Sequence, residues 1–189
     1  MPHGTLIIIG ASGTGKTTLL EELLKLYAHA SKVVTYTTRA SRPGERHMKD
    51  YYFCSEEEYM SLREKGFFAE SEYVHGRWYG TPAYELVEKN DVLSLLCIDI
   101  KGAKVLKEKY PYMKIIAIEP PSLVALEPRL RRRAQDSEEN IQERLENART
   151  EIEGARISGV VDLFVVNDDF TVLWNTVRAF IEREMIANV

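Results

Sequence analysis

The stretch TLIIIGASGTGKTTLLEELLKL, residues 5–26, constrains the fold of this chain more than any other part of the sequence. Residues 6–9 are apolar and rich in β-formers, which predicts a buried strand that ends at Gly10. From Lys16 onward the leucines recur with helical spacing and predict a helix over about residues 16–28. The stretch is therefore expected to fold as a strand, a glycine-rich turn and a helix.

The turn fits the pattern G-x-x-x-x-G-K-[ST] at every fixed position. Glycines let successive backbone N–H groups point at a phosphate chain, and the N-terminus of the following helix adds positive charge. We expect Lys16 to reach the β- and γ-phosphate oxygens and the Thr17 hydroxyl to ligate Mg²⁺. The predicted triphosphate site comprises Gly10, Ala11, Ser12, Gly13, Thr14, Gly15, Lys16, Thr17 and Thr18. GTPases, ATP-driven motors and small kinases all carry such a turn, so it does not identify the reaction.

The length, charge and hydropathy of the chain are those of an ordinary globular protein. Its 189 residues suit one domain with an insertion or two, and no apolar run approaches the roughly 18 residues of a membrane span. The start of the chain lacks the features of a secretory signal, so a cytoplasmic protein is expected. A formal net charge of -4 argues against nonspecific nucleic-acid binding. Cys54 and Cys97 lack metal-ligand spacing and are interpreted as packing residues.

Further apolar runs predict strands at residues 92–100, 114–120 and 163–168, with helical segments between them and a closing helix after the last strand. Ser55 and Glu58 form a capping box that predicts another helix start, and Gly66 supplies its stop. Strands that alternate with helices indicate an α/β fold in which a parallel sheet has helices on both faces. Two polar stretches, beginning near residues 33 and 126, interrupt this alternation.

The first polar stretch carries TYTTRASRPGERHMKDYYF at residues 35–53 and FFAESEYVHGRWYGTP at residues 67–82. Arg39 and Arg42 can grip a phosphate monoester from two sides, while Tyr51 and Tyr79 can donate hydroxyls to its remaining oxygens. Taken singly, such arginines are more often surface charges and such tyrosines core aromatics. The ordered set T-T-R, R-x-G-E, D-Y-x-F, F-x-E and Y-G-[ST] resembles the acceptor-binding insertion of guanylate kinases.

This resemblance covers nearly the whole chain and implies a P-loop NTPase-type parallel sheet with two additions. The implied core comprises residues 1–32, 89–125 and 150–189. A small mixed α/β insertion of residues 33–88 would bind GMP, and a helical lid of residues 126–149 would close over ATP.

Guanine recognition is expected at Glu70, whose carboxylate can accept from the N1–H and the exocyclic amine, and at Thr35, whose hydroxyl can donate to O6. By family position, Thr81 and Asp99 are further candidates. The chain departs from the family at Thr35, where Ser is usual, at Met48, where Gly is usual, and at Cys97, where Asp is usual. The last two departures bear on rate and nucleotide preference.

The segment LEPRLRRRAQDSEENIQERLENA, residues 126–148, resembles the arginine lid of the same family. The resemblance implies that Arg133 and Arg144 act in catalysis with Lys16 and that Arg129 contacts ATP. Asn167 lies where the family places an adenine-side loop.

The implied reaction is Mg²⁺-dependent transfer of phosphate from ATP to GMP, and to dGMP, in a monomer or homodimer with no nucleic-acid or membrane partner. The alternative is a catalytically weak module of the same fold that binds a phosphorylated partner. The intact glycine-rich turn, which is predicted to bind phosphate, and the arginine lid argue against this alternative.

Overall fold

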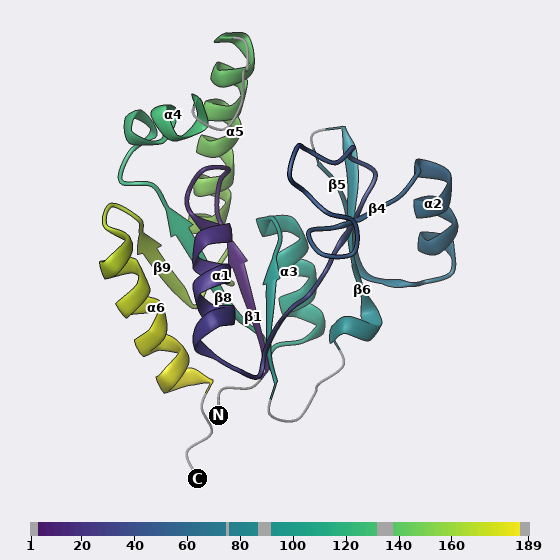
Figure 1. Cartoon of the computed structure of the whole chain (residues 1–189), viewed down its shortest axis with the longest axis horizontal. Helices are drawn as coiled ribbons and strands as arrows, with labels where there is room; N and C mark the ends of the chain where they lie inside the picture. The colour runs from purple at the N-terminus through teal and green to yellow at the C-terminus, as the bar shows by residue number, and fades with distance from the viewer. Residues whose placement is uncertain (1–3, 75, 87–91, 132–137, 186–189) are drawn as a thin grey trace.

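The computed structural model describes residues 4–74, 76–86, 92–131 and 138–185. Its larger sheet has five strands, all parallel, in the order β2-β7-β1-β8-β9 (Figure 1). These strands are β1 (Gly4–Ile9), β2 (Ala30–Lys32), β7 (Leu93–Cys97), β8 (Lys114–Glu119) and β9 (Leu163–Val166). The predicted α/β class with a parallel sheet is confirmed.

Strand β1 is buried on both faces, so its alternate side chains enter two different cores. Leu6 and Ile8 pack with leucines of α1 (Lys16–Leu26) and apolar residues of α6 (Phe170–Glu184). Ile7 and Ile9 pack on the other face with residues of α3 (Ile100–Lys109) and α5 (Glu138–Ile157). Helices cover both faces of the sheet, as expected for a parallel sheet whose strands are continuously apolar.

A second sheet of four strands lies within residues 33–88, in the order β4-β3-β6-β5. Its strands are β3 (Tyr36–Thr37), β4 (Tyr52–Phe53), β5 (Phe68–Val74) and β6 (Arg77–Pro82). The pair β3–β4 is parallel and the other two pairs are antiparallel, so the sheet is of mixed type. Helix α2 (Glu56–Glu64) starts at the predicted capping box of Ser55 and Glu58, and a 3-10 turn, η1 (Ala83–Leu86), follows β6.

The predicted strand over residues 92–100 is too long at its C-terminal end. Strand β7 ends at Cys97, and α3 begins at Ile100. The Asp99 carboxylate accepts hydrogen bonds from the backbone N–H groups of Lys101 and Gly102, which makes it the N-cap of α3. The cap ends the strand although Ile98 and Ile100 continue its apolar pattern.

The helices α4 (Leu123–Arg131) and α5 stand beside the glycine-rich turn (Figure 1). Leu126 and Leu130 of α4 pack with Ile141 of α5 and with Ala11 of the turn. Helix α5 continues without a break past residue 149 and buries Ala155 against the larger sheet. Arg133 lies outside the described residues. Within the described ranges, no helix combines the length and apolar character needed to cross a membrane.

Candidate active site

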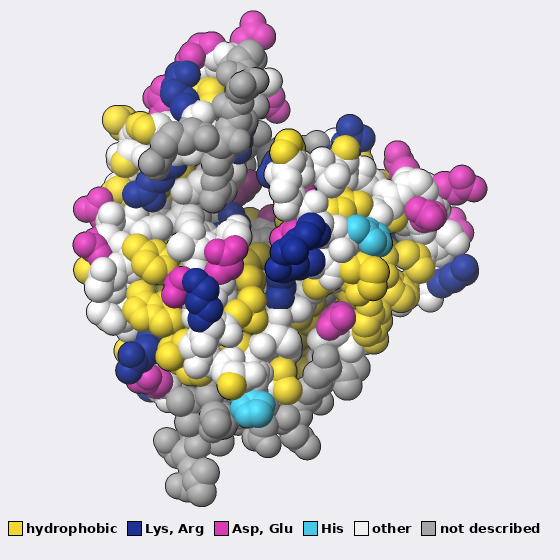
Figure 2. Space-filling model, in the orientation of Figure 1, with side chains coloured by type: hydrophobic (Ala, Val, Ile, Leu, Met, Phe, Trp, Pro, Cys, Tyr) yellow, Lys and Arg dark blue, Asp and Glu magenta, His cyan; other side chains and the backbone are white. Residues whose placement is uncertain are grey.

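A cleft of about 410 Å³ lies between the carboxyl end of the larger sheet and the second sheet. Figure 2 shows the surface hollowed between the helices α4 and α5 and the second sheet, with Lys and Arg side chains gathered beside the hollow. Ligands of open α/β folds bind at this edge of the sheet. The predicted site residues that line the cleft are Gly10, Ser12, Gly13, Gly15, Lys16, Thr17, Thr35, Arg42, Tyr51, Glu70, Tyr79 and Asp99.

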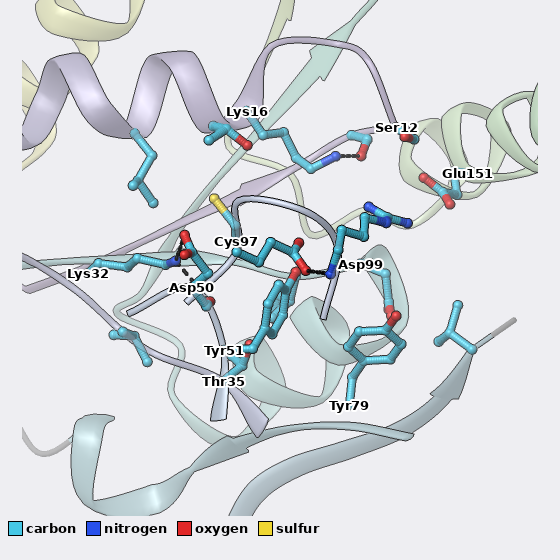
Figure 3. Close-up of a pocket in the computed structure, with 18 of the residues that line it drawn as sticks. Ser12, Lys16, Lys32, Thr35, Asp50, Tyr51, Tyr79, Cys97, Asp99 and Glu151 are labelled. Atoms are coloured by element: carbon cyan, nitrogen blue, oxygen red, sulfur yellow. Dashed lines mark hydrogen bonds and ion pairs between the residues drawn. The ribbon is translucent and has the colours of Figure 1, made fainter. Parts of the chain in front are cut away.

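The glycine-rich turn forms one wall of the cleft (Figure 3). Gly10 has φ 142° and Gly15 has φ 105°, a region that side chains rarely adopt. A Cβ atom on Gly10 would lie 2.4 Å from the carbonyl oxygen of Ile118, so the turn approaches β8 too closely for any other residue. Thr14 and Ala11 are fully buried beneath the turn, and the Thr14 hydroxyl donates to the Ala11 carbonyl over 2.9 Å. These two residues support the turn and do not line the cleft.

Lys16 folds back over the turn, and its Nζ donates hydrogen bonds to the carbonyl oxygens of Gly10 and Ala11. Thr17 is exposed in the first turn of α1 and lines the cleft. Thr18 is exposed on the same helix and is not part of the lining. The lysine ammonium therefore lies at the turn that the sequence predicts to hold phosphates.

Asn167 and Arg129 hold the turn from its other side. The Asn167 side-chain amide donates to the Thr14 carbonyl over 2.7 Å, and Arg129 donates to the Asn167 backbone carbonyl over 3.0 Å. A Cβ atom on Gly15 would lie 2.5 Å from the Asn167 side-chain nitrogen. Gly15 therefore gives the amide room to support the turn, a positional role that the sequence did not indicate.

Helix α5 brings Arg144 to the turn, where its Nη2 donates to the Ser12 hydroxyl over 2.9 Å. This pair joins residues that are 132 positions apart in the chain. One predicted lid arginine thus reaches the phosphate turn.

On the second sheet's side, Glu45 organises the two predicted phosphate-binding arginines. Its Oε1 lies 2.9 Å from Arg39 Nη2, and its Oε2 accepts from the Arg42 backbone N–H over 2.8 Å. Burial opposes ionisation of Glu45, but these bonds lower its pKa below the usual value. Arg42 lines the cleft, whereas Arg39 is not part of the lining and lies over the Tyr51 ring, 5.3 Å from its centroid.

Tyr51 and Tyr79 face each other across an edge-on ring contact with centroids 6.2 Å apart. Burial raises the pKa of Tyr51 to about 12, and the neighbouring Tyr79 adds to this shift. The Tyr51 hydroxyl therefore stays protonated at neutral pH and is available as a hydrogen-bond donor.

Glu70 is a buried carboxyl group in this cleft, with only 5% of its surface exposed. The hydroxyl of Thr81, which is fully buried on β6, donates to Glu70 Oε1. Burial raises the pKa of Glu70 to about 7, and the charge of Asp99 adds to the shift. The structure thus brings three predicted base-binding residues together, and Thr35 lines the same cleft.

Five titratable residues that were not predicted as site residues also line the cleft: Lys32, Glu45, Asp50, Cys97 and Glu151. Lys32 ends β2, and its Nζ donates to the backbone carbonyls of Lys49 and Asp50 over 3.0 and 2.9 Å, joining the larger sheet to the 33–88 segment. Burial raises the pKa of Cys97 to about 11, which keeps the thiol neutral. Glu45 and Asp50 belong to the R-x-G-E and D-Y-x-F patterns, and Cys97 is a departure from the family, so the sequence contained a signal for these three residues. It contained none for Lys32 and Glu151.

Comparisons with known proteins agree with this geometry. A family model described as guanylate kinase matches residues 3–184. The guanylate kinase of Geobacter metallireducens is 45% identical over 172 residues, covering 89% of this chain and 83% of that protein. That of Nitratidesulfovibrio vulgaris is 42% identical over 185 residues, covering 95% and 87% respectively. A crystal structure of guanylate kinase from Anaplasma phagocytophilum has a TM-score of 0.74 at 28% identity, covering 100% of this chain and 89% of that one. The chain therefore belongs to the guanylate kinase family.

Proposed function

We propose that the cleft transfers the γ-phosphoryl group of ATP to GMP, giving ADP and GDP, with dGMP as a second acceptor. One observation carries the proposal: a single cleft has the glycine-rich turn on one wall and, on the other, the buried carboxyl group of Glu70, which accepts a hydrogen bond from the Thr81 hydroxyl behind it. The guanylate kinases to which the chain is similar support the same reaction.

We assign the substrates to separate parts of the chain. Residues 1–32, 89–125 and 150–189 form the core, residues 33–88 form the GMP-binding insertion, and residues 126–149 form the lid. The separate second sheet supports the insertion, and the contact between Arg144 and Ser12 supports the lid. The enzyme acts in the cytoplasm.

The triphosphate of ATP lies along residues 10–18, with Lys16 on its β- and γ-phosphate oxygens. Lys16 exchanges its bonds to the Gly10 and Ala11 carbonyls for bonds to phosphate, which are stronger because both partners are charged. Arg144 moves from the neutral Ser12 hydroxyl to the transferring group and stabilises its charge. Arg133 is assigned the same role from its position in the family pattern.

The residues of the turn fit Mg²⁺. The Thr17 hydroxyl is exposed at the start of α1, beside the phosphate turn. Within the described part of the chain, no three His, Cys, Asp or Glu side chains form a metal-holding group. One hydroxyl with phosphate oxygens and waters is a donor set that suits Mg²⁺ at nucleotide sites. When bound, Mg²⁺ neutralises charge on the phosphate oxygens of ATP.

The acceptor phosphate is held by Arg39, Arg42, Tyr51 and Tyr79, and its oxygen attacks the γ-phosphorus directly. No side chain becomes covalently attached, because the two nucleotides supply the nucleophile and the leaving group. The protein contributes position and positive charge at the transferring group. Glu70 and Thr35, with Thr81 and Asp99, select guanine.

An assay of ADP release across GMP, dGMP, AMP, UMP and CMP at pH 8 tests the function. We expect strong activity with GMP and dGMP and weak activity with the others. A protein that binds GMP but releases no ADP would contradict the proposal and favour a binding module.

A further inference from the structure

Glu70 has an unusual setting for a carboxyl group that must recognise a base. Its Oε1 accepts from the Thr81 hydroxyl of β6, and its Oε2 lies against α3, where a Cβ atom on Gly102 would be 2.9 Å away. With 5% of its surface exposed, the side chain is almost fully removed from water.

The charges that surround Glu70 are mostly acidic. Asp99, at the start of α3, and Glu72, on the same strand, both disfavour its ionisation. The phenol of Tyr59 on α2 also interacts with it, while Lys101 and Lys104 of α3 are exposed. In the described part of the chain, no Lys or Arg forms an ion pair with Glu70.

Other titratable groups face the same cleft from the remaining elements. Tyr51 and Tyr79 bring phenols, and Cys97 brings a thiol that burial keeps neutral. The positive charges are those of Lys16, Lys32 and Arg42, and the remaining acidic groups are Glu45, Asp50 and Glu151. Lys32 is held by backbone carbonyls, and the Arg42 backbone is held by Glu45. Burial without a cationic partner therefore dominates at Glu70, and both of its protonation states are populated near neutral pH.

The two protonation states have different hydrogen-bonding patterns. An ionised carboxylate only accepts, which suits the N1–H and exocyclic amine of guanine. A protonated carboxyl group offers one donor and one acceptor, and its O–H can donate to the N1 atom of adenine, which is an acceptor. The hydroxyl of Thr35 fits either base, because it can donate to the guanine O6 or accept from the adenine amine.

We propose that protonation of Glu70 switches the preference of the acceptor site from guanine to adenine, so that AMP becomes a substrate as the pH falls. The inference rests on the proposed function, because it concerns the acceptor of the same phosphoryl transfer. It adds a second substrate class and a condition under which that class is used.

The ratio of kcat/KM for GMP to kcat/KM for AMP isolates the effect of Glu70 protonation. GMP and AMP carry the same phosphate monoester, so ionisation of that group cancels when kcat/KM for GMP is divided by kcat/KM for AMP. GMP uses the ionised form of Glu70 and AMP the protonated form. The ratio should therefore fall about tenfold for each unit by which the pH is lowered.

The experiment measures kcat/KM for both nucleotides from about pH 5.5 to about pH 8.5 in the wild-type protein and in Glu70→Gln. The glutamine amide carries one donor and one acceptor at every pH, so we expect its ratio to be low and independent of pH. Circular dichroism checks the fold of both proteins across the range.

A wild-type ratio that stays constant with pH, or AMP turnover that remains undetectable at the acidic end, would overturn the inference. If Glu70→Gln fails to fold, the pH profile of the wild-type protein alone still distinguishes these outcomes from the expected one. An absence of phosphoryl transfer to GMP at pH 8 would instead contradict the proposed function, and the inference with it.

Discussion

The side-chain amide of Asn167 donates a 2.7 Å hydrogen bond to the carbonyl oxygen of Thr14, 153 residues earlier in the chain. Asn167 follows β9, and Thr14 lies in the glycine-rich turn after β1. Arg129 of α4 donates to the backbone carbonyl of Asn167, so the loop after β9 is tied to both the turn and α4. A residue that the sequence suggested for contacts to adenine also supports the phosphate turn.

We therefore expect Asn167→Ala to weaken ATP use. The substitution leaves the Thr14 carbonyl without its partner, which costs about 1–2 kcal/mol of unfolding free energy. The KM for ATP should rise several-fold while the KM for GMP stays unchanged. Urea unfolding and steady-state kinetics measure these effects, with the exposed Asn175→Ala on α6 as the control. Equal changes for both substrates would contradict a local role at the turn.

Lys16→Ala should abolish nearly all turnover while leaving GMP binding intact. The lysine ammonium lies at the turn, whereas the residues proposed to bind GMP lie on the 33–88 segment and at the start of α3. We expect kcat to fall by about a hundredfold or more. Titration calorimetry with GMP supplies the second measurement, and Lys25→Ala, at the exposed end of α1, is the control. Loss of GMP binding in a folded variant would show that the two sites are not separable.

Arg42→Ala should weaken the binding of GMP more than the binding of guanosine. Arg42 lines the cleft, and a hydrogen bond between two charged groups contributes about 1.5–3 kcal/mol, so GMP should bind roughly ten- to a hundredfold less tightly. Guanosine lacks the phosphate and should bind as before. Arg39→Ala should act in the same direction, but it also removes the ion pair with Glu45.

The exposed Arg77→Ala on β6 provides the control for these titrations, because it removes the same charge from the same 33–88 segment without changing the lining of the cleft. Equal losses for GMP and guanosine in Arg42→Ala would mean that the arginine acts on the base or on folding.

The sequence correctly predicted the secondary-structure elements that are determined by residues close together in the chain. The strand, turn and helix of residues 5–26 and the capping box of Ser55 and Glu58 were both found as expected. The end of β7 was misplaced because hydrophobicity continues through Ile98 and Ile100, while the capping bonds of Asp99 depend on backbone geometry.

Contacts between distant segments could not be predicted in the same way. Lys32 and Glu151 reach the cleft only because β2 and α5 are packed beside it, and a lysine at the end of a short strand is usually exposed. The pairing of Asn167 with Thr14 likewise depends on how β9 meets the turn. Such contacts follow from the tertiary arrangement, which no local pattern records.

Met48 stands where guanylate kinases usually have Gly, and the effect of this difference on folding stability can be measured. Its φ of 64° lies in the left-handed region, and the residue is 62% exposed, so its packing offsets little of the strain. This conformation costs a residue with a Cβ about 1–2 kcal/mol, and glycine loses about 0.5–1 kcal/mol through entropy. Met48→Gly should therefore raise the unfolding free energy by up to about 1.5 kcal/mol. Met48→Ala keeps the Cβ and should give no gain; equal urea midpoints for both variants would contradict this account.

Helix α3 approaches Glu70 closely at Gly102. Alanine substitutions at Gly102 and at a second helical glycine, Gly154, test what this approach does. Gly102 and Gly154 lie within α3 and α5, where alanine favours the helix by about 0.5–1 kcal/mol. A Cβ atom on Gly154 would meet Ile100 at an ordinary 3.6 Å, but one on Gly102 would lie 2.9 Å from Glu70 Oε2. Only Gly102→Ala should therefore displace the carboxyl group.

We expect Gly102→Ala to raise the KM for GMP by about tenfold, because a displaced carboxylate loses its alignment with the donor edge of guanine. The KM for ATP should stay unchanged, since the phosphate turn is on the opposite wall. Gly154→Ala should increase the unfolding free energy and leave both KM values as they are. Urea unfolding and steady-state kinetics on the two variants supply the comparison. If Gly102→Ala matched Gly154→Ala in its kinetics, the spacing between α3 and Glu70 would have no part in guanine binding.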